Sequence, residues 1–289
     1  MKKVFLLLII FMVTGNLLFA GEKDPNEPQQ KEPEKLQDNS FLIEEAYNQE
    51  PGIVQHIQSY QYNSNDESWV YIFTQEWPLH GKKHQISFLI PVMHLTDDTS
   101  ATGTGDILIN YRYQLVDKDK VALSPRFSVI IPTGNYKKGL GTGSFGFQTN
   151  IPLSVELSEE FVTHWNIGLT VTPGAREPGG ASANTIGFNY GASIIWLTSE
   201  HFNLMFEAAG TSNENVIADD LGRISTPKED SFFINPGMRF AINCDSGLQI
   251  VPGISFPIGV GPSEGENGVF LYLSFEHKMF DPGEEDSSH

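Results

Sequence analysis

The sequence predicts an all-β protein, a transmembrane antiparallel up-and-down β-barrel of about twelve strands. Three observations predict this fold. Apolar and polar residues alternate with a period of two along most of the chain, charged residues fall on the polar phase, and short and long connections alternate. Successive side chains of a strand point to opposite faces, so each segment offers one face to lipid and one to a lumen.

The first twenty residues predict export. Lys2 and Lys3 precede an apolar run from Val4 to Met12, and the stretch closes on small or neutral residues through Ala20. This order is typical of a secretory signal peptide, so we expect residues 1–20 to be removed. A membrane anchor is the alternative, but the run is short for a helix that spans a bilayer.

Two polar stretches flank the structured part. Residues 21–40 are rich in Pro, Glu and Gln, and residues 281–289 are short and acidic. Neither stretch has enough apolar surface to offset the entropy of ordering it, so we expect a disordered tether and a disordered tail. The barrel is therefore expected over residues 53–280.

Twelve segments show the alternation that a tilted membrane strand requires. In the clearest segment, Ile107, Ile109 and Tyr111 fall on one face, and Asp106, Asn110 and Arg112 fall on the other. The first three segments alternate less cleanly than the rest. The expected strands are 53–62, 67–77, 83–92, 104–115, 121–131, 143–157, 161–172, 185–197, 201–210, 230–244, 247–258 and 267–280.

Charge and connection length distinguish a membrane barrel from a soluble β-sandwich. A Lys or Arg that faces lipid at mid-depth costs about 2–4 kcal/mol, and the charges of the well-alternating segments avoid the apolar phase. Tight turns, such as 116–120, alternate with longer loops, such as 132–142 and 211–229, as in outer-membrane barrels. Five aromatic residues at the tight-turn ends are expected to form an interfacial girdle: Trp77, Tyr113, Trp196, Phe240 and Phe275.

The polar phase identifies the residues expected to line the lumen. These residues are either a hydrogen-bonded network that stiffens the wall or the lining of a selective pore, and the sequence leaves both interpretations open. Counting back from the turn at 116–120 predicts that Arg126 lies opposite Asn110. The lumen-lining candidates are Asp106, Asn110, Arg112, Arg126, Gln148, Asn150, Glu156, His164, Asn189 and Arg239.

Residues 41–52 mix apolar and acidic side chains, unlike the tether before them. We expect this segment to fold into the periplasmic mouth as a plug, with Glu44, Glu45 and Tyr47 as the plug candidates. Its carboxylates are expected to meet Arg112 or Arg239. The alternative is that it extends the disordered tether.

No motif predicts catalysis, a cofactor or a metal centre. Gly141–Gly146 fits a dinucleotide-binding pattern, but a strand follows it where a helix is needed. His164, on the polar face with Asn166 two residues on, is the best-placed catalytic candidate. Outer-membrane phospholipases resemble this chain in size, but the His-x-Ser-Asn-Gly run that they carry is absent from residues 164–168. His80 and His84 lack nearby carboxylate partners for a metal.

Composition excludes further classes. The formal net charge is −18, which argues against nucleic acid as a partner. The single cysteine, Cys244, excludes an intramolecular disulfide and a metal site built on several cysteines.

Several blocks resemble a known family. Phe41–His56, Thr74–Pro78, Gly105–Leu115 and Leu123–Gly168 are similar to outer-membrane proteins labelled as belonging to the MetA pathway of phenol degradation. The resemblance implies an outer-membrane barrel with a role in the passage of small compounds, aromatic ones included. It implies no catalytic residues.

The sequence therefore predicts an outer-membrane channel or transporter rather than an enzyme, with lipid and a small, aromatic or hydrophobic, solute as its partners. One alternative is a structural or ligand-binding barrel that uses its long outer loops. The other is a barrel lipid hydrolase, for which no matching motif is present.

Overall fold

The computed structural model describes residues 40–79, 81–96, 100–244 and 248–279. The expected signal peptide, the tail and all of the tether except Ser40 lie outside the described residues. Within them, no helix is both long and apolar enough to cross a membrane.

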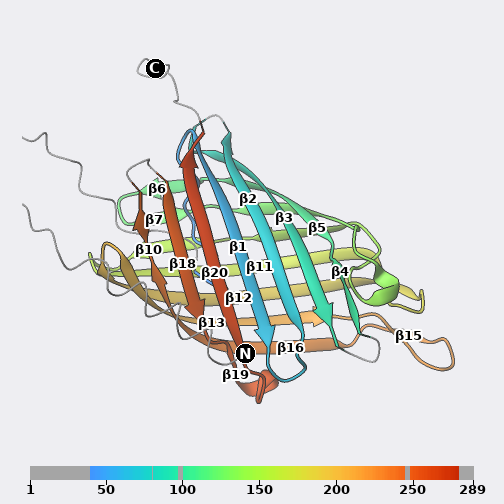
Figure 1. Ribbon diagram of the computed structural model, residues 1–289. Coiled ribbons are helices and arrows are strands. Elements are labelled where there is room, and N and C mark those ends of the chain that lie inside the picture. The colour runs from blue at the N-terminus through green and yellow to red at the C-terminus, as the bar shows by residue number, and fades with distance from the viewer. Residues whose placement is uncertain (1–39, 80, 97–99, 245–247, 280–289) are drawn as a thin grey trace, which may run out of the picture. The chain divides into compact units, whose positions relative to one another are not determined.

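One continuous sheet makes up the barrel, and it closes on itself because the first strand pairs with the last (Figure 1). The fold prediction is confirmed: the sheet is a closed antiparallel barrel of 12 strands. Closure leaves no sheet edge, which is the condition for strands to span lipid.

Some barrel strands consist of two or three shorter elements. The elements are β1 (Ile53–Asn63), β2 (Trp69–Leu79), β3 (His84–Leu95), β4 (Ala101–Thr104), β5 (Ile107–Tyr113), β6 (Val116–Lys118), β7 (Val121–Leu123), β8 (Arg126–Ile131), β9 (Gly146–Asn150), β10 (Leu153–Glu156), β11 (Phe161–Arg176), β12 (Ser182–Ser199), β13 (Phe202–Glu214), β16 (Lys228–Phe240), β17 (Ile242–Asn243), β18 (Gln249–Ser255), β19 (Ile258–Gly259) and β20 (Gly268–Lys278). A separate hairpin, β14 (Ile217–Ala218) and β15 (Ile224–Ser225), and two short 3-10 helices, η1 (Tyr136–Lys138) and η2 (Gly261–Ser263), complete the described elements.

Prolines mark several of the interruptions. Pro125 separates β7 from β8, Pro152 separates β9 from β10, and Pro257 separates β18 from β19. Proline has no N–H to donate to the ladder, so the expected strands 121–131, 143–157 and 247–258 are each divided.

The strands that border the long loops extend beyond the ends that the sequence predicted, so those predicted ends were wrong. β11 continues to Arg176 and β12 begins at Ser182, four and three residues beyond the predicted limits. β13 and β16 likewise extend into the predicted loop 211–229, which also holds the hairpin β14–β15. A strand that continues into water no longer needs an apolar phase, so its sequence loses the alternation that marks it.

The predicted register next to the turn at 116–120 was also wrong, by two residues. Arg126 pairs with Arg112, and Asn110 pairs with Ser128. The hairpin β6–β7 continues the ladder to Lys118 and Val121, and Asp119 adopts a left-handed φ of 54° in the turn. The real turn is therefore shorter than the five residues counted.

The two faces of the wall differ as predicted on most strands. Outward side chains such as Tyr111, Phe127, Trp165 and Ile167 are exposed, because in the membrane they would contact lipid. The aromatics expected in the girdle include Tyr113, Trp196 and Phe240, which are also exposed.

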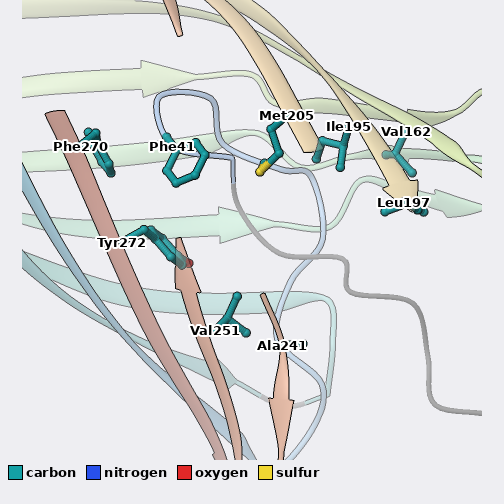
Figure 2. Close-up of a cluster of buried hydrophobic side chains, with 9 residues drawn as sticks. All are labelled: Phe41, Val162, Ile195, Leu197, Met205, Ala241, Val251, Phe270 and Tyr272. Atoms are coloured by element: carbon teal, nitrogen blue, oxygen red, sulfur yellow. The ribbon is translucent and has the colours of Figure 1, made fainter. Parts of the chain in front are cut away.

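Inside the barrel, a buried cluster occupies part of the interior (Figure 2). It consists of Phe41, Val162, Ile195, Leu197, Met205, Ala241, Val251, Phe270 and Tyr272. Phe41 belongs to no strand, so the segment before β1 contributes to the interior packing.

Candidate lumenal site

Residues 40–52, here called the lumenal segment, follow the inner wall before β1 begins. Its backbone N–H groups donate to inward side chains rather than to a neighbouring strand. The acceptors come from four strands and one connection: Glu207 on β13 for Leu42, Asn166 on β11 for Glu44, Ser154 on β10 for Ala46, Gln85 on β3 for Gln49, and Gln114 after β5 for Asn48, over 2.7 to 3.1 Å.

Carboxamides also satisfy the carbonyl groups of the segment. Asn166 Nδ2 donates to the Glu44 carbonyl over 2.8 Å, and Gln114 Nε2 donates to the Ala46 carbonyl over 2.8 Å. Backbone groups within the strands are committed to the sheet ladder, so most partners of the segment are side chains, and the Lys82 carbonyl that accepts from Asn48 Nδ2 lies in a turn. A carboxamide both donates and accepts, as a peptide group does.

Apolar side chains of the segment lie over glycines in the wall. The ring of Phe41 lies against Gly253 and Gly237, and Ile43 lies against Gly191. Phe41 also packs edge-on to Phe270 and Tyr272, with centroids 5.7 and 6.3 Å apart (Figure 2). The missing side chains at these glycines are what makes room for the segment.

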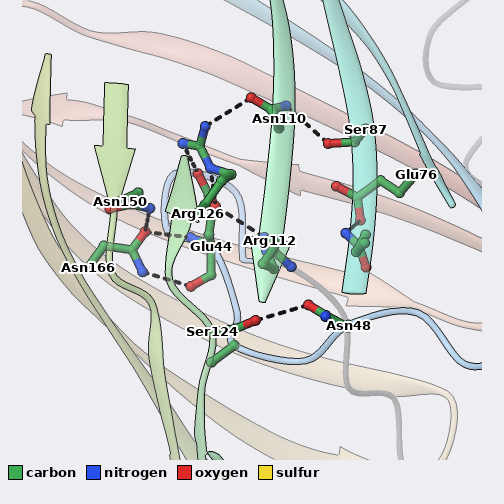
Figure 3. A network of polar contacts seen from close by, with 12 residues as sticks. Glu44, Asn48, Glu76, Ser87, Asn110, Arg112, Ser124, Arg126, Asn150 and Asn166 are labelled. Atoms are coloured by element: carbon green, nitrogen blue, oxygen red, sulfur yellow. Dashed lines mark hydrogen bonds and ion pairs between the residues drawn. The ribbon is translucent and has the colours of Figure 1, made fainter. Parts of the chain in front are cut away.

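Glu44 is the centre of an ion cluster (Figure 3). Its carboxylate lies 2.7 Å from Arg126 Nη2 and 3.1 Å from Arg112 Nη2. Arg126 also donates to Asn110 over 3.1 Å and to Gln148 over 3.0 Å. Arg112 in addition donates to the Tyr47 carbonyl over 3.2 Å.

Of the two arginines expected to meet the segment, Arg112 pairs with Glu44, and Arg126 is a further partner of the same carboxylate. The guanidinium of Arg239 lies over the rings of Phe41 and Tyr272, 5.2 and 4.4 Å from their centroids. Glu45, the second acidic plug candidate, is buried against the wall.

The remaining lumen-lining candidates take different places. Asn150 donates to Asn166 over 3.1 Å and accepts from Asn189 over 3.4 Å, which continues the polar network. Glu156 is half-buried at the end of β10. Asp106 binds the long loop 132–142, where it accepts hydrogen bonds from Gly134 N and Thr142 N over 2.9 and 2.7 Å.

His164 lies beside a serine that the sequence did not single out. Ser154 Oγ is 2.7 Å from His164 Nδ1, and it also accepts from Ala46 N over 2.8 Å. Both side chains are buried, at 0% and 1% exposure, so the lumenal segment covers the pair. The sequence also gave no signal that Gln85, Ser154 or Glu207 bind the segment, since each simply occupies the polar phase.

Lys82 in a tight turn anchors the far end of the lumenal segment. Its ammonium lies 2.9 Å from Glu50 and 3.0 Å from Asp117. Partial burial alone would lower the pKa of Lys82, but hydrogen bonds to these two carboxylates outweigh it and raise that pKa. His84 in the next strand contacts Tyr111 Oη at 2.6 Å, and His80, its partner in the considered metal site, lies outside the described residues.

A cavity of about 210 Å³ lies between the lumenal segment and the wall. Its lining mixes apolar and polar side chains. The apolar ones include Ile57, Ile72, Leu89, Leu108 and Phe270, and the polar ones include Arg126 and Gln148. A second cavity, about 490 Å³, lies near the long loops and includes Met93, Ile130, Tyr136 and Leu140.

A closed antiparallel sheet with an apolar outer face and a mostly polar interior defines an outer-membrane β-barrel. The chain belongs to the family described as "Putative MetA-pathway of phenol degradation", whose model matches residues 53–260. The resemblance found in the sequence is thereby confirmed.

Two solved structures show the same fold. An outer-membrane channel from Pseudomonas putida F1 has a TM-score of 0.61 at 14% identity, over 80% of this chain and 97% of that chain. The NanC porin has a TM-score of 0.50 at 9% identity, over 76% of this chain and 98% of that chain. No curated protein matches the sequence.

Proposed function

We propose that this protein is a channel that passes small solutes across the outer membrane, and that the lumenal segment constricts it. The observation that carries the proposal is the cavity between that segment and β1, β2, β3, β5, β8, β9 and β20. A space of about 210 Å³ inside a closed barrel, bounded by a segment that belongs to no strand, is suited to a gated passage.

The mixed lining of the cavity indicates the class of solute. Ile57, Ile72 and Leu89 offer apolar surface, and Gln148 and the Glu44–Arg126 ion pair offer polar groups. This combination fits a small aromatic or otherwise hydrophobic molecule that carries one polar group. The family description, which names phenol degradation, points to the same class.

The constriction is separable from the wall. The backbone N–H groups of Leu42 to Gln49 that bind the wall donate to side chains, so residues 41–50 can leave without breaking a rung of the sheet ladder. The wall also retains its closure through β1 and β20.

Single-channel recording in a planar bilayer tests the proposal. Deletion of residues 41–50 should raise conductance, and replacing the same ten residues with a Gly-Ser sequence should raise it equally, since both remove the contacts. Candidate aromatic solutes should then block the ionic current of the full-length protein. Unchanged conductance in both variants, with unchanged barrel stability, would contradict a constricting role.

A ligand-binding barrel is the second candidate, and one observation favours it. The hairpin β14–β15 presents Ile217, Leu221 and Ile224 to solvent, with Leu221 78% exposed. Binding that is lost on deleting residues 216–226, in a protein without conductance, would support this alternative.

We infer further that the protein is not an enzyme. Ser154 and His164 are the pair that most resembles a nucleophile and its base. The Ala46 N–H, however, donates a hydrogen bond to the serine oxygen. Ester hydrolysis that disappears in Ser154→Ala would refute this inference.

A further inference from the structure

The outer face of β1 and β2 carries polar side chains at the depth of the membrane interior. Inward residues of β1, such as Ile57 and Ser59, border the cavity, so His56 and Gln58 point outward. On β2, Ile72 and Thr74 border the cavity, so Gln75 points outward. We call His56, Gln58 and Gln75 the outer patch.

The register places this patch within the lipid-facing band. Gln58 is the middle residue of β1 and pairs with Leu273 on one side and Phe73 on the other. Gln75 pairs with His56 and with Phe88. The outward neighbours at the same depth are thus apolar, as are Ile167 and Leu169 on the opposite side of the barrel.

The chain only partly satisfies the amides of the outer patch. Gln58 Oε1 accepts from the Tyr71 hydroxyl over 3.0 Å. Among the residues that the structure describes, the Gln58 amide N–H groups and the Gln75 side chain have no hydrogen-bond partner within the chain. Lipid cannot supply one, so a polar group here favours a protein partner.

We propose that the outer patch is the contact between two copies of this chain in the membrane. Two copies inserted with the same polarity are related by a two-fold axis along the membrane normal, so residues of equal depth meet. Gln58 then faces Gln58 of the second copy. A carboxamide is self-complementary, because each copy has an N–H donor and a C=O acceptor for the other. The proposal does not depend on solute passage.

Cysteine cross-linking in native outer membranes tests this contact. In a Cys244→Ser background, Gln58→Cys should form a disulfide-linked species of twice the mass on oxidation. Ile167→Cys is the matched control: it lies outward at a similar position on β11, six strands from β1 in either direction. Equal linking of the two variants, or linking of Gln58→Cys to a protein of another mass, would overturn the proposal.

A second measurement guards against a cysteine variant that fails to insert. The wild-type protein, extracted in native lipid particles, should have the mass of two chains, and the Gln58→Leu/Gln75→Leu double variant should have the mass of one. Leucine is compatible with lipid, so the variant should still insert. A wild-type protein with the mass of one chain would also overturn the proposal.

Discussion

The ring of Phe41 fits against Gly253, with Cε1 2.9 Å from the point that a Cβ atom there would occupy. This contact joins the lumenal segment to β18, whose other neighbours in the wall are β16 and β20. The fit is specific, since one added methyl group would collide with the ring.

Gly253→Ala should therefore loosen the lumenal segment while the barrel still folds. Overpacking of this kind costs about 1–3 kcal/mol, and here the strain falls on Phe41 rather than on the ladder. We expect more frequent open events in single-channel recordings. Adding Phe41→Ala removes the collision, so Gly253→Ala should then have no further effect beyond that of Phe41→Ala alone.

Glu44→Gln should shift ion selectivity toward anions. The substitution keeps the shape of the side chain but leaves Arg112 and Arg126 without their shared carboxylate. The reversal potential in a KCl gradient measures the shift. Glu264→Gln, at an exposed site beside η2, is the control and should leave the reversal potential unchanged.

The Lys82 anchor should be insensitive to pH across the neutral range. A lysine whose pKa is raised in the folded state contributes its stabilisation fully below the unfolded pKa, and that contribution is lost only as the pH rises through the folded pKa. Lys82→Met should lower thermal stability by no more than about 1 kcal/mol, because the pair is partly exposed and screened. A large loss on this substitution at pH 7 would contradict that assignment.

Closure through β1 and β20 predicts resistance to denaturing detergent until heating. The unboiled protein should migrate differently from the boiled protein on a denaturing gel. Identical migration, together with solubility in the absence of detergent, would indicate a soluble sandwich.

Protease accessibility should report the orientation of the barrel. The connection between β13 and β16 should be cleaved in intact cells, because the long loops face outward in an outer-membrane barrel. The tight turn between β6 and β7 should be protected. Cleavage at that turn in intact cells would reverse the orientation.

The alternation of side chains was sufficient to predict the fold, because lipid outside and water or polar groups inside act on every strand. The alternation did not predict the parts of β11, β12, β13 and β16 that extend toward the long loops, because lipid no longer surrounds the wall there. The first strands alternated poorly for a reason now visible: Ile57 and Ile72 face inward, whereas Gln58 and Gln75 face outward.

The polar phase identified Arg112 and Arg126 as inward, but not their shared partner. That Glu44 meets both arginines depends on the path of the lumenal segment across strands that lie up to 165 residues away in the sequence. No local pattern encodes that path. The glycines that lie against Phe41 and Ile43 are the sequence feature that best reflects this path. Their role can be recognised only once the position of the segment is known.

The lumenal segment binds side chains from β3, β10, β11 and β13, and these line one lumen only in an assembled wall. The residues of the lumenal segment must therefore be among the last to find their places, although they precede every barrel strand in the sequence. During insertion they have no binding site until the strands that supply it are in register. Docking of the lumenal segment is thus a final step of assembly, and it follows from the completion of the barrel.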